Sequence, residues 1–235
     1  MRVGAMRAGV WAFVGARPSA NVAAIRVEAR TAPPRKGWNP QEFARAQIRC
    51  LVHQLFQTAQ PRPLRQVVFS GVDPQTDALA VCRSVGEVLA LETTMDVAVA
   101  GDGLDSTRVE ELLVRSSEAG SSLRETGAQL RRNLWHLPLE VSGVEGSAAS
   151  LHRYISAVRR EFEYSIIAAP PAISSQTMAL AQLADGIVLI LSAQHTRRGQ
   201  ARKIKATLEE AQARLLGMVL SDREFPIPER IYRRL

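Results

Sequence analysis

Short continuous runs of apolar residues alternate along this chain with longer stretches of helical periodicity. The clearest runs are residues 66–70, 97–100, 164–168 and 186–191, and turn residues separate them from their neighbours. Strands that are apolar on both faces are typical of a parallel sheet covered by helices on both sides. The regular alternation of strand and helix therefore predicts a three-layer α/β sandwich with a mostly parallel sheet.

The stretches between these runs carry apolar residues at helical spacing. We expect helices over residues 40–57, from the turn at 71–75 through residue 91, and over 106–117, 147–161, 175–183 and 197–213, with further strands at 133–137 and 216–220. In a parallel sheet of this kind, ligands bind beyond the carboxyl ends of the strands. Functional residues are therefore expected in the loops that follow the strands.

Net charge, cysteine spacing and the length of the apolar runs indicate which partners and which compartment suit the chain. Its formal net charge of +7 suits an anionic partner, such as nucleic acid or an acidic membrane surface, and it equally suits a solvated basic surface. Cys50 and Cys82 show no metal-ligand or disulfide spacing, which favours a reducing compartment. No apolar run approaches the roughly 20 residues of a membrane span. We expect a cytoplasmic protein without a bound metal.

A break rich in turn residues separates the N-terminal segment from the rest. Residues 31–37 read Thr-Ala-Pro-Pro-Arg-Lys-Gly, which is turn and linker chemistry. We therefore expect three parts. Residues 1–40 form an N-terminal arm or hairpin with its linker, residues 41–222 form the α/β domain, and residues 223–235 form a basic C-terminal tail.

The loop after the first apolar run lies where a phosphate-binding loop would stand. Such a loop, G-x-x-x-x-G-K-[ST], wraps backbone amides around phosphates, and its Lys and hydroxyl contact the phosphates and Mg²⁺. Here residues 70–78 read Ser-Gly-Val-Asp-Pro-Gln-Thr-Asp-Ala. Taken alone, this loop does not predict a nucleotide site.

Several further segments, taken in order, resemble one known family. Residues 133–138 read Asn-Leu-Trp-His-Leu-Pro, residues 166–171 read Ile-Ile-Ala-Ala-Pro-Pro, and residues 183–191 read Leu-Ala-Asp-Gly-Ile-Val-Leu-Ile-Leu. With residues 41–49, 120–127 and 216–220, they resemble the kinase domain of the bacterial tyrosine kinases of capsule and exopolysaccharide synthesis. That family belongs to the deviant P-loop group with the partition and division ATPases. The resemblance implies a P-loop NTPase-like fold from about residue 41 onward.

The loop residues that carry the chemistry in that family are replaced here. Aligned without gaps on the family's S-A-x-P-G-E-G-K-S, the loop has Asp77 at the Lys position and Ala78 at the Mg²⁺ hydroxyl. Pro74 and Thr76 replace glycines, so one N–H is lost and side chains obstruct the backbone. Gly71 belongs to the same degenerate loop. Asp77 would also repel phosphate by roughly 4 kcal/mol per unit charge at ~4 Å and an effective dielectric constant of ~20.

The carboxylates that the resemblance implies are also missing. Gly101 and Gly103 stand at the two positions of an acidic D-x-D motif, and Ala168 stands at the Walker B aspartate. Asp102, between the two glycines, is interpreted as a turn residue; its alternative is an acidic ligand in an alignment shifted by one. We therefore predict no catalytic residue, no bound nucleotide and no Mg²⁺. The chain is interpreted as a pseudoenzyme.

Candidate contact residues lie on the first helix of the domain and on a later basic helix. Residues 41–49 resemble the family's E-x-x-R-x-x-R oligomerisation helix through Glu42 and Arg45, but Ile48 occupies the second Arg position and Arg49 follows it. This departure puts the family's ring contact in doubt.

Two further basic segments offer contacts of their own. Arg197 and Arg198 begin a basic helix that would contact an anion or partner, or else present a solvated face. In the tail, arginines flank Tyr232, a candidate phosphoacceptor. The alternative for the tail is a terminal turn that packs on the domain or on a neighbour.

With these losses, the resemblance implies a non-catalytic regulatory or scaffold subunit of capsule or exopolysaccharide synthesis and export. The implied partners are a membrane polysaccharide co-polymerase that controls chain length, a kinase paralogue, or further copies of the chain, met in the cytoplasm or at the inner face of the plasma membrane. Two alternatives stay open. One is a divergent protein tyrosine autokinase that uses ATP and Mg²⁺, and the other is a partition- or division-like adaptor for nucleic acid or anionic membrane.

Overall fold

The computed structural model describes residues 12–14, 40–57, 63–101, 122–139 and 148–222. The strands are β1 (Ala12–Val14), β2 (Gln66–Gly71), β3 (Val97–Gly101), β4 (Ala128–Arg131), β5 (Leu134–Pro138), β6 (Tyr164–Ala169), β7 (Gly186–Ser192) and β8 (Leu215–Ser221). The helices are α1 (Pro40–Val52), continued by a π-helical turn η1 (His53–Gln57), α2 (Ala78–Glu92), α4 (Leu123–Thr126), α5 (Ala148–Glu161), α6 (Ser175–Leu183) and α7 (Arg198–Glu210). The helix expected over residues 106–117 lies outside the described residues.

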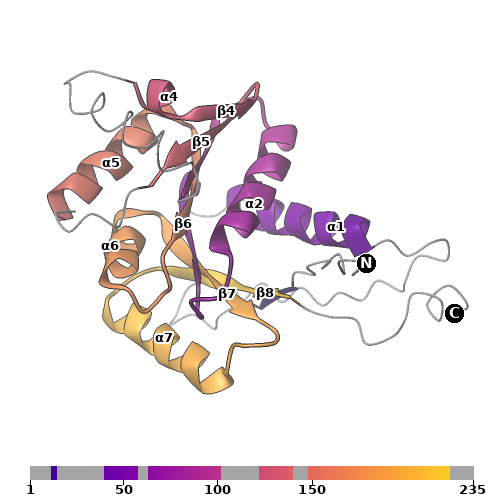
Figure 1. The fold of residues 1–235 in the computed structure, drawn as a ribbon, viewed down its shortest axis with the longest axis vertical. Coiled ribbons are helices and arrows are strands. Elements are labelled where there is room, and N and C mark those ends of the chain that lie inside the picture. The colour runs from indigo at the N-terminus through magenta and orange to yellow at the C-terminus, as the bar shows by residue number, and fades with distance from the viewer. Residues whose placement is uncertain (1–11, 15–39, 58–62, 102–121, 140–147, 223–235) are drawn as a thin grey trace, which may run out of the picture.

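These strands form one sheet in the order β1-β8-β7-β2-β6-β3-β5-β4. The strands from β8 to β5 run parallel to their neighbours, while β1 and β4 pair antiparallel at the two edges. Helices α1 and α2 lie on one side of the sheet, and α5, α6 and α7 lie on the other (Figure 1). The predicted three-layer α/β sandwich with a mostly parallel sheet is confirmed.

Each central strand contributes side chains to both cores. On β2, Val67 and Phe69 belong to the core under α1 and α2, whereas Val68 belongs to the core under α5, α6 and α7. Strand β7 divides in the same way, with Val188 on the first side and Ile187 on the second. Successive side chains of a strand point to opposite faces, so a strand covered on both faces must be apolar throughout. This is why the sequence shows continuous runs here.

The edges of the sheet hold the elements that the periodicity did not predict. Residues 12–14, assigned to an arm or hairpin, pair with β8 as the edge strand β1. The short elements α4 and β4 also went unpredicted, because β4 is four residues long and mostly exposed and so carries no apolar pattern. The division of the chain at residues 40 and 222 stays a prediction.

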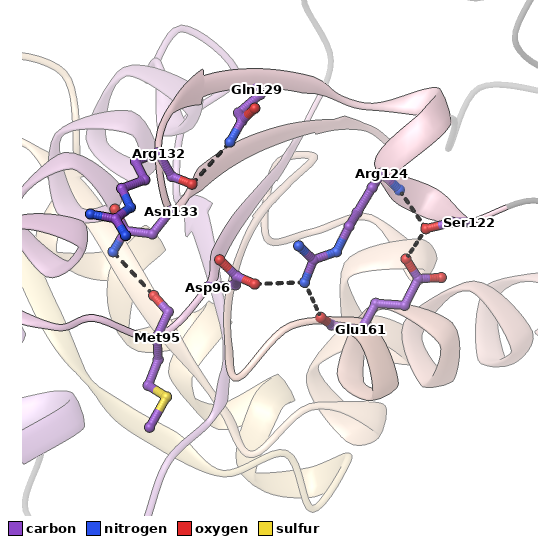
Figure 2. A network of polar contacts seen from close by, with 8 residues as sticks. All are labelled: Met95, Asp96, Ser122, Arg124, Gln129, Arg132, Asn133 and Glu161. Carbon is purple, nitrogen blue, oxygen red and sulfur yellow. Dashed lines mark hydrogen bonds and ion pairs between the residues drawn. The ribbon is translucent and has the colours of Figure 1, made fainter.

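A polar network holds α4 at the end of the sheet where the parallel strands begin (Figure 2). The Nη2 of Arg124 donates to the Asp96 carboxylate at 2.6 Å and to the Glu161 carbonyl at 3.0 Å. The same guanidinium lies over the rings of Trp135 and Phe162, with its carbon 5.4 and 5.1 Å from their centroids. One arginine therefore joins α4 to the start of β3, to β5 and to the end of α5.

Asn133 links the start of β5 to the connection between α2 and β3. Its Nδ2 donates to the carbonyls of Ala90, Thr93 and Met95 at 3.0, 2.9 and 3.2 Å. Figure 2 shows the Asn133 amide pointing toward Met95, which lies in the connection from α2 to β3. These hydrogen bonds satisfy carbonyls at and beyond the end of α2, because such carbonyls have no donor within the helix.

Asp185 anchors the start of the central strand. Its Oδ2 accepts from the backbone amides of Arg65 and Gln66, both at 2.8 Å, and its Oδ1 accepts from Arg159 at 2.7 Å. Burial acts to raise the pKa of Asp185, but these hydrogen bonds and the Arg159 charge outweigh it, so the pKa lies below its ordinary value. Asp185 is therefore structural, as expected for a residue in the turn that leads into a strand.

We expect Asp185→Asn to lower the free energy of unfolding at pH 7 by about 1.5–3 kcal/mol, because charge-assisted hydrogen bonds are lost. A carboxyl with a lowered folded-state pKa stabilises the protein above its unfolded pKa of about 3.9 and loses that contribution as pH falls through the folded pKa. The difference between wild type and variant should therefore shrink as pH falls below about 4. Urea titrations at several pH values measure it, and a difference independent of pH would contradict the assignment.

Candidate functional site

The loop between β2 and α2 folds back on itself at the carboxyl end of the central strand. The amide of Thr76 donates to the Asp73 carbonyl at 3.1 Å, and the amide of Ala78 donates to the Thr76 carbonyl at 2.9 Å. Pro74, which follows Asp73, has no N–H to offer. A phosphate-binding loop needs such amides to point at the ligand. Here the amides of Thr76 and Ala78 donate to carbonyls of the loop instead.

Asp77, the residue at the Lys position, is the N-cap of α2. Its Oδ1 accepts a hydrogen bond of 2.9 Å from the amide of Ala80. Asp is among the preferred N-cap residues, and its charge is favourable beside the positive end of the helix dipole. The end of α2 that would attract a phosphate therefore already holds a carboxylate of the chain itself.

The side chain of Thr76 fills the space above Gly71. A Cβ at Gly71 would lie 2.6 Å from the Thr76 Cβ and 3.0 Å from the Asp73 carbonyl oxygen. Thr76 therefore packs closely over the backbone in the curve of the loop. Its Oγ1 is buried and has no hydrogen-bond partner.

Apolar atoms occupy the positions of two of the lost carboxylates. A Cβ at Gly101 would lie 3.0 Å from the Ala168 Cβ and 2.7 Å from the Leu79 Cδ1. Ala168 is itself only 9% exposed. A side chain at Gly101 would therefore meet Leu79 and Ala168 at once. Asp102 and Gly103 lie outside the described residues.

A hollow of about 200 Å³ remains between the loop and the end of β6. It is lined by Gly71, Asp73, Pro74, Thr76, Asp77, Ala78, Leu79, Ala168, Ala169, Pro170 and Pro171. Drug-sized ligands occupy pockets of about 300–1,000 Å³, so this hollow is small for a nucleotide. Its lining includes carboxylates and apolar groups but no basic side chain.

The far wall of the hollow is a braced turn after β6. The carbonyl of Pro170 accepts from the Ser70 hydroxyl at 2.5 Å and from the Thr177 hydroxyl at 2.9 Å. The amide of Ala172 donates to the Gly71 carbonyl at 2.9 Å. Hydrogen bonds thus join the Pro170-Pro171 turn to β2 and α6.

A second brace joins the loop to α7. The Thr196 hydroxyl donates to the buried carboxylate of Asp73, and its oxygen accepts from the Ser192 amide at 2.8 Å. The Nε2 of Gln200 donates to the Val72 carbonyl at 3.2 Å. The sequence did not predict this bridge, because its partners are more than 100 residues apart and none forms a motif.

The predicted contact residues on α1, Glu42, Arg45 and Arg49, are all exposed. Arg49 also donates from Nε to the Glu92 carboxylate on α2 at 2.9 Å. Ile48, at the second Arg position, is 5% exposed in the core. The helix therefore contacts α2 through Arg49, while Glu42 and Arg45 remain at the surface.

Arg197 and Arg198 are exposed at the start of α7, where Arg197 is the N-cap residue and makes no side-chain cap hydrogen bond. Tyr232 lies outside the described residues. Within the described ranges, no three His, Cys, Asp or Glu side chains gather as a metal site would require, and the absence of a bound metal stays a prediction. No helix in the described part of the chain is long and apolar enough to cross a membrane.

Comparison with solved structures identifies the fold. The chimerical protein CapA2B2 shares 14% identity over 77% of this chain and 86% of that chain, with a TM-score of 0.63. The kinase domain of the Escherichia coli tyrosine kinase ETK shares 13% identity over 83% of each chain, also with a TM-score of 0.63. The MinD cell division protein of Aquifex aeolicus shares 13% identity over 72% of each chain, with a TM-score of 0.52.

This chain has their fold. The predicted P-loop NTPase-like architecture of the partition and division type is therefore confirmed. No family model and no curated protein sequence matches the chain. At these identities the likeness extends to the fold alone, and the chemistry must be argued from the site.

We expect Ala168→Asp to lower the free energy of unfolding by about 3 kcal/mol, because it buries an uncompensated charge against Leu79. Restoring one carboxylate would thus cost stability without creating a magnesium site. Gln75→Asp is the matched control, since Gln75 is exposed on the same loop and should tolerate the charge. Chemical denaturation measures both variants, and an Ala168→Asp variant as stable as the control would contradict the apolar packing described.

Proposed function

We propose that this protein is a non-catalytic regulatory or scaffold subunit of capsule or exopolysaccharide synthesis and export that acts through protein–protein contact. The observation that carries the proposal is the capture of the α2 N-terminus by the Asp77 carboxylate. A nucleotide phosphate and this carboxylate compete for the same end of the helix. The Asp77 carboxylate therefore occupies the position at the α2 N-terminus that a phosphate would take.

Three further features support the loss of catalysis. The loop amides at Thr76 and Ala78 donate to carbonyls of the loop, so opening them for phosphate would first break those hydrogen bonds. Asp77 would repel a phosphate rather than attract it. The space beside Ala168 is apolar, so Mg²⁺ would find no carboxylate there. Each loss alone weakens nucleotide binding, and together they oppose the binding of both phosphate and Mg²⁺.

The polysaccharide context rests on the resemblance in sequence and is supported by the shared fold with the ETK kinase domain. We propose as partner a membrane polysaccharide co-polymerase that controls chain length, or a kinase paralogue, met in the cytoplasm at the inner face of the plasma membrane. A cross-link in cells between this chain and such a protein is the expected finding. Its absence when both are present would count against this partner.

Calorimetric titration of the purified protein with ATP and Mg²⁺ should detect no binding at millimolar nucleotide, and incubation with radiolabelled ATP should leave the protein unlabelled. The reason is that the amides of Thr76, Ala78 and Ala80 already donate to acceptors of the chain. Micromolar binding accompanied by turnover would overturn the proposal. Label on Tyr232 would favour a divergent autokinase instead.

A further inference from the structure

The start of α7 gathers basic side chains at the surface. Arg197, Arg198, Arg202 and Lys203 are all exposed, and no acidic residue occurs between positions 186 and 208. We infer that these four residues, the basic end of α7, bind the headgroup phosphates of an anionic lipid bilayer. The inference deepens the proposed function and rests on it for the membrane face as the location. It adds a contact with lipid to the contact with a partner protein.

The four cations have no partner within the described part of the chain. None of them forms an ion pair there, whereas Lys205, further along the helix, pairs with Glu209 at 3.2 Å. The helix end adds to their charge, because the first amides of a helix carry a positive partial charge and the N-cap residue Arg197 offers them no side-chain acceptor. The basic end of α7 therefore presents a positive field that an external anion can neutralise.

The distribution of charge along α7 is the reverse of the one that stabilises a helix. Carboxylates are favourable at the N-terminal end of a helix and cations at the C-terminal end. Helix α1 follows this rule, with Glu42 in its first turn and Arg49 in its last, but α7 begins with Arg198 and ends with Glu210. Arg198 and Arg202 also stand four residues apart, a spacing at which like charges destabilise a helix. An arrangement that lowers the stability of the helix calls for a function at its surface.

Contacts on the other side of α7 hold its basic end in place. The Thr196 hydroxyl is bonded to the Asp73 carboxylate, and Gln200 donates to the Val72 carbonyl at 3.2 Å. Ile204 packs into the core on the same side of the sheet as α5 and α6. Figure 1 shows α7 at the margin of the molecule, beyond α6. The basic end can thus meet an external surface without a rearrangement of the fold.

The lack of apolar contacts favours a lipid surface over a protein partner. The exposed large apolar side chains of the described residues are Leu91, Met95, Leu130 and Ile173, and none of them lies on α7. A protein interface is centred on well-packed residues from which water is excluded. The attraction of a basic segment to anionic headgroups needs no apolar contact, because it acts through charge alone.

The extent of the positive charge favours a bilayer over nucleic acid. From Arg198 to Lys203 the helix rises by roughly 8 Å, and the exposed carboxylates of Glu209 and Glu210 follow in its last turn. A helix that reads nucleic acid lies in the major groove between two phosphate backbones, where these carboxylates would be repelled. A bilayer is flat, so one end of the helix can meet it alone.

Co-sedimentation of the full chain with lipid vesicles tests the inference. At about 50 mM salt, we expect the protein to bind vesicles of about one-third phosphatidylglycerol in phosphatidylcholine and to leave vesicles of pure phosphatidylcholine unbound. At about 500 mM salt, binding should fall at least tenfold, because salt screens the attraction between exposed charges.

Two double variants that remove equal charge locate the contact. Arg198→Gln with Arg202→Gln should weaken vesicle binding roughly 25-fold, since each basic residue near an anionic surface contributes about fivefold. Its thermal midpoint should equal or exceed that of the wild type, because like charges are removed from a helix N-terminus. Arg131→Gln with Arg132→Gln is the matched control. It removes two exposed arginines between β4 and β5 and should bind like the wild type.

No binding at low salt, equal binding to neutral vesicles, or an equal loss in both double variants would overturn the inference. So would binding to double-stranded DNA that is tighter than binding to vesicles and is lost in Arg198→Gln with Arg202→Gln, since the occupant would then be nucleic acid. Release from vesicles by inorganic phosphate at constant ionic strength would indicate a site for a single phosphate and would also overturn it.

The ATP titration that tests the proposed function is run on the same protein. Binding of ATP with Mg²⁺ would contradict the proposed function and leave the result with vesicles standing. Failure to bind anionic vesicles, with no binding of ATP, would contradict the lipid contact alone.

Discussion

The hydrogen bond from the Ala80 amide to the Asp77 carboxylate is the contact on which the rest of this site depends. The first amides of a helix have no partner within the helix, and in phosphate-binding folds the phosphate supplies one. Asp77 supplies it here from the chain itself. Because the carboxylate is both an acceptor and a negative charge, it provides a partner for one amide of the helix end and repels an anion that approaches it.

The surrounding structure is consistent with a helix end that is closed in this way. Thr76 covers Gly71, the loop amides turn to the carbonyls of the loop, and Leu79 packs beside Ala168 where a magnesium site would need carboxylates. None of these contacts requires a ligand to complete it. The two cores on the faces of the sheet reach the loop through Val72 and Ala78, so apolar packing holds both of its ends without a ligand.

The sequence predicts those features that follow from local pattern. Val67 to Phe69 and Ile187 to Ile190 read as buried strands because both of their faces are covered, and the structure confirms this. The replacement at Asp77 was visible in the sequence, but its role as a cap depends on where α2 begins. The bond from Thr196 to Asp73 was not predictable, because chain folding alone brings these residues together. Likewise β4 is a strand only because β5 lies beside it.

Amide hydrogen exchange of the loop tests the account most directly. In the protein without added ligand, the amides of Thr76, Ala78 and Ala80 should exchange slowly, because each donates to an acceptor in the chain. Adding ATP with Mg²⁺ or inorganic pyrophosphate should leave those rates unchanged. Fast exchange that becomes slow on addition of either ligand would show that the amides are free to bind phosphate, and would contradict the account.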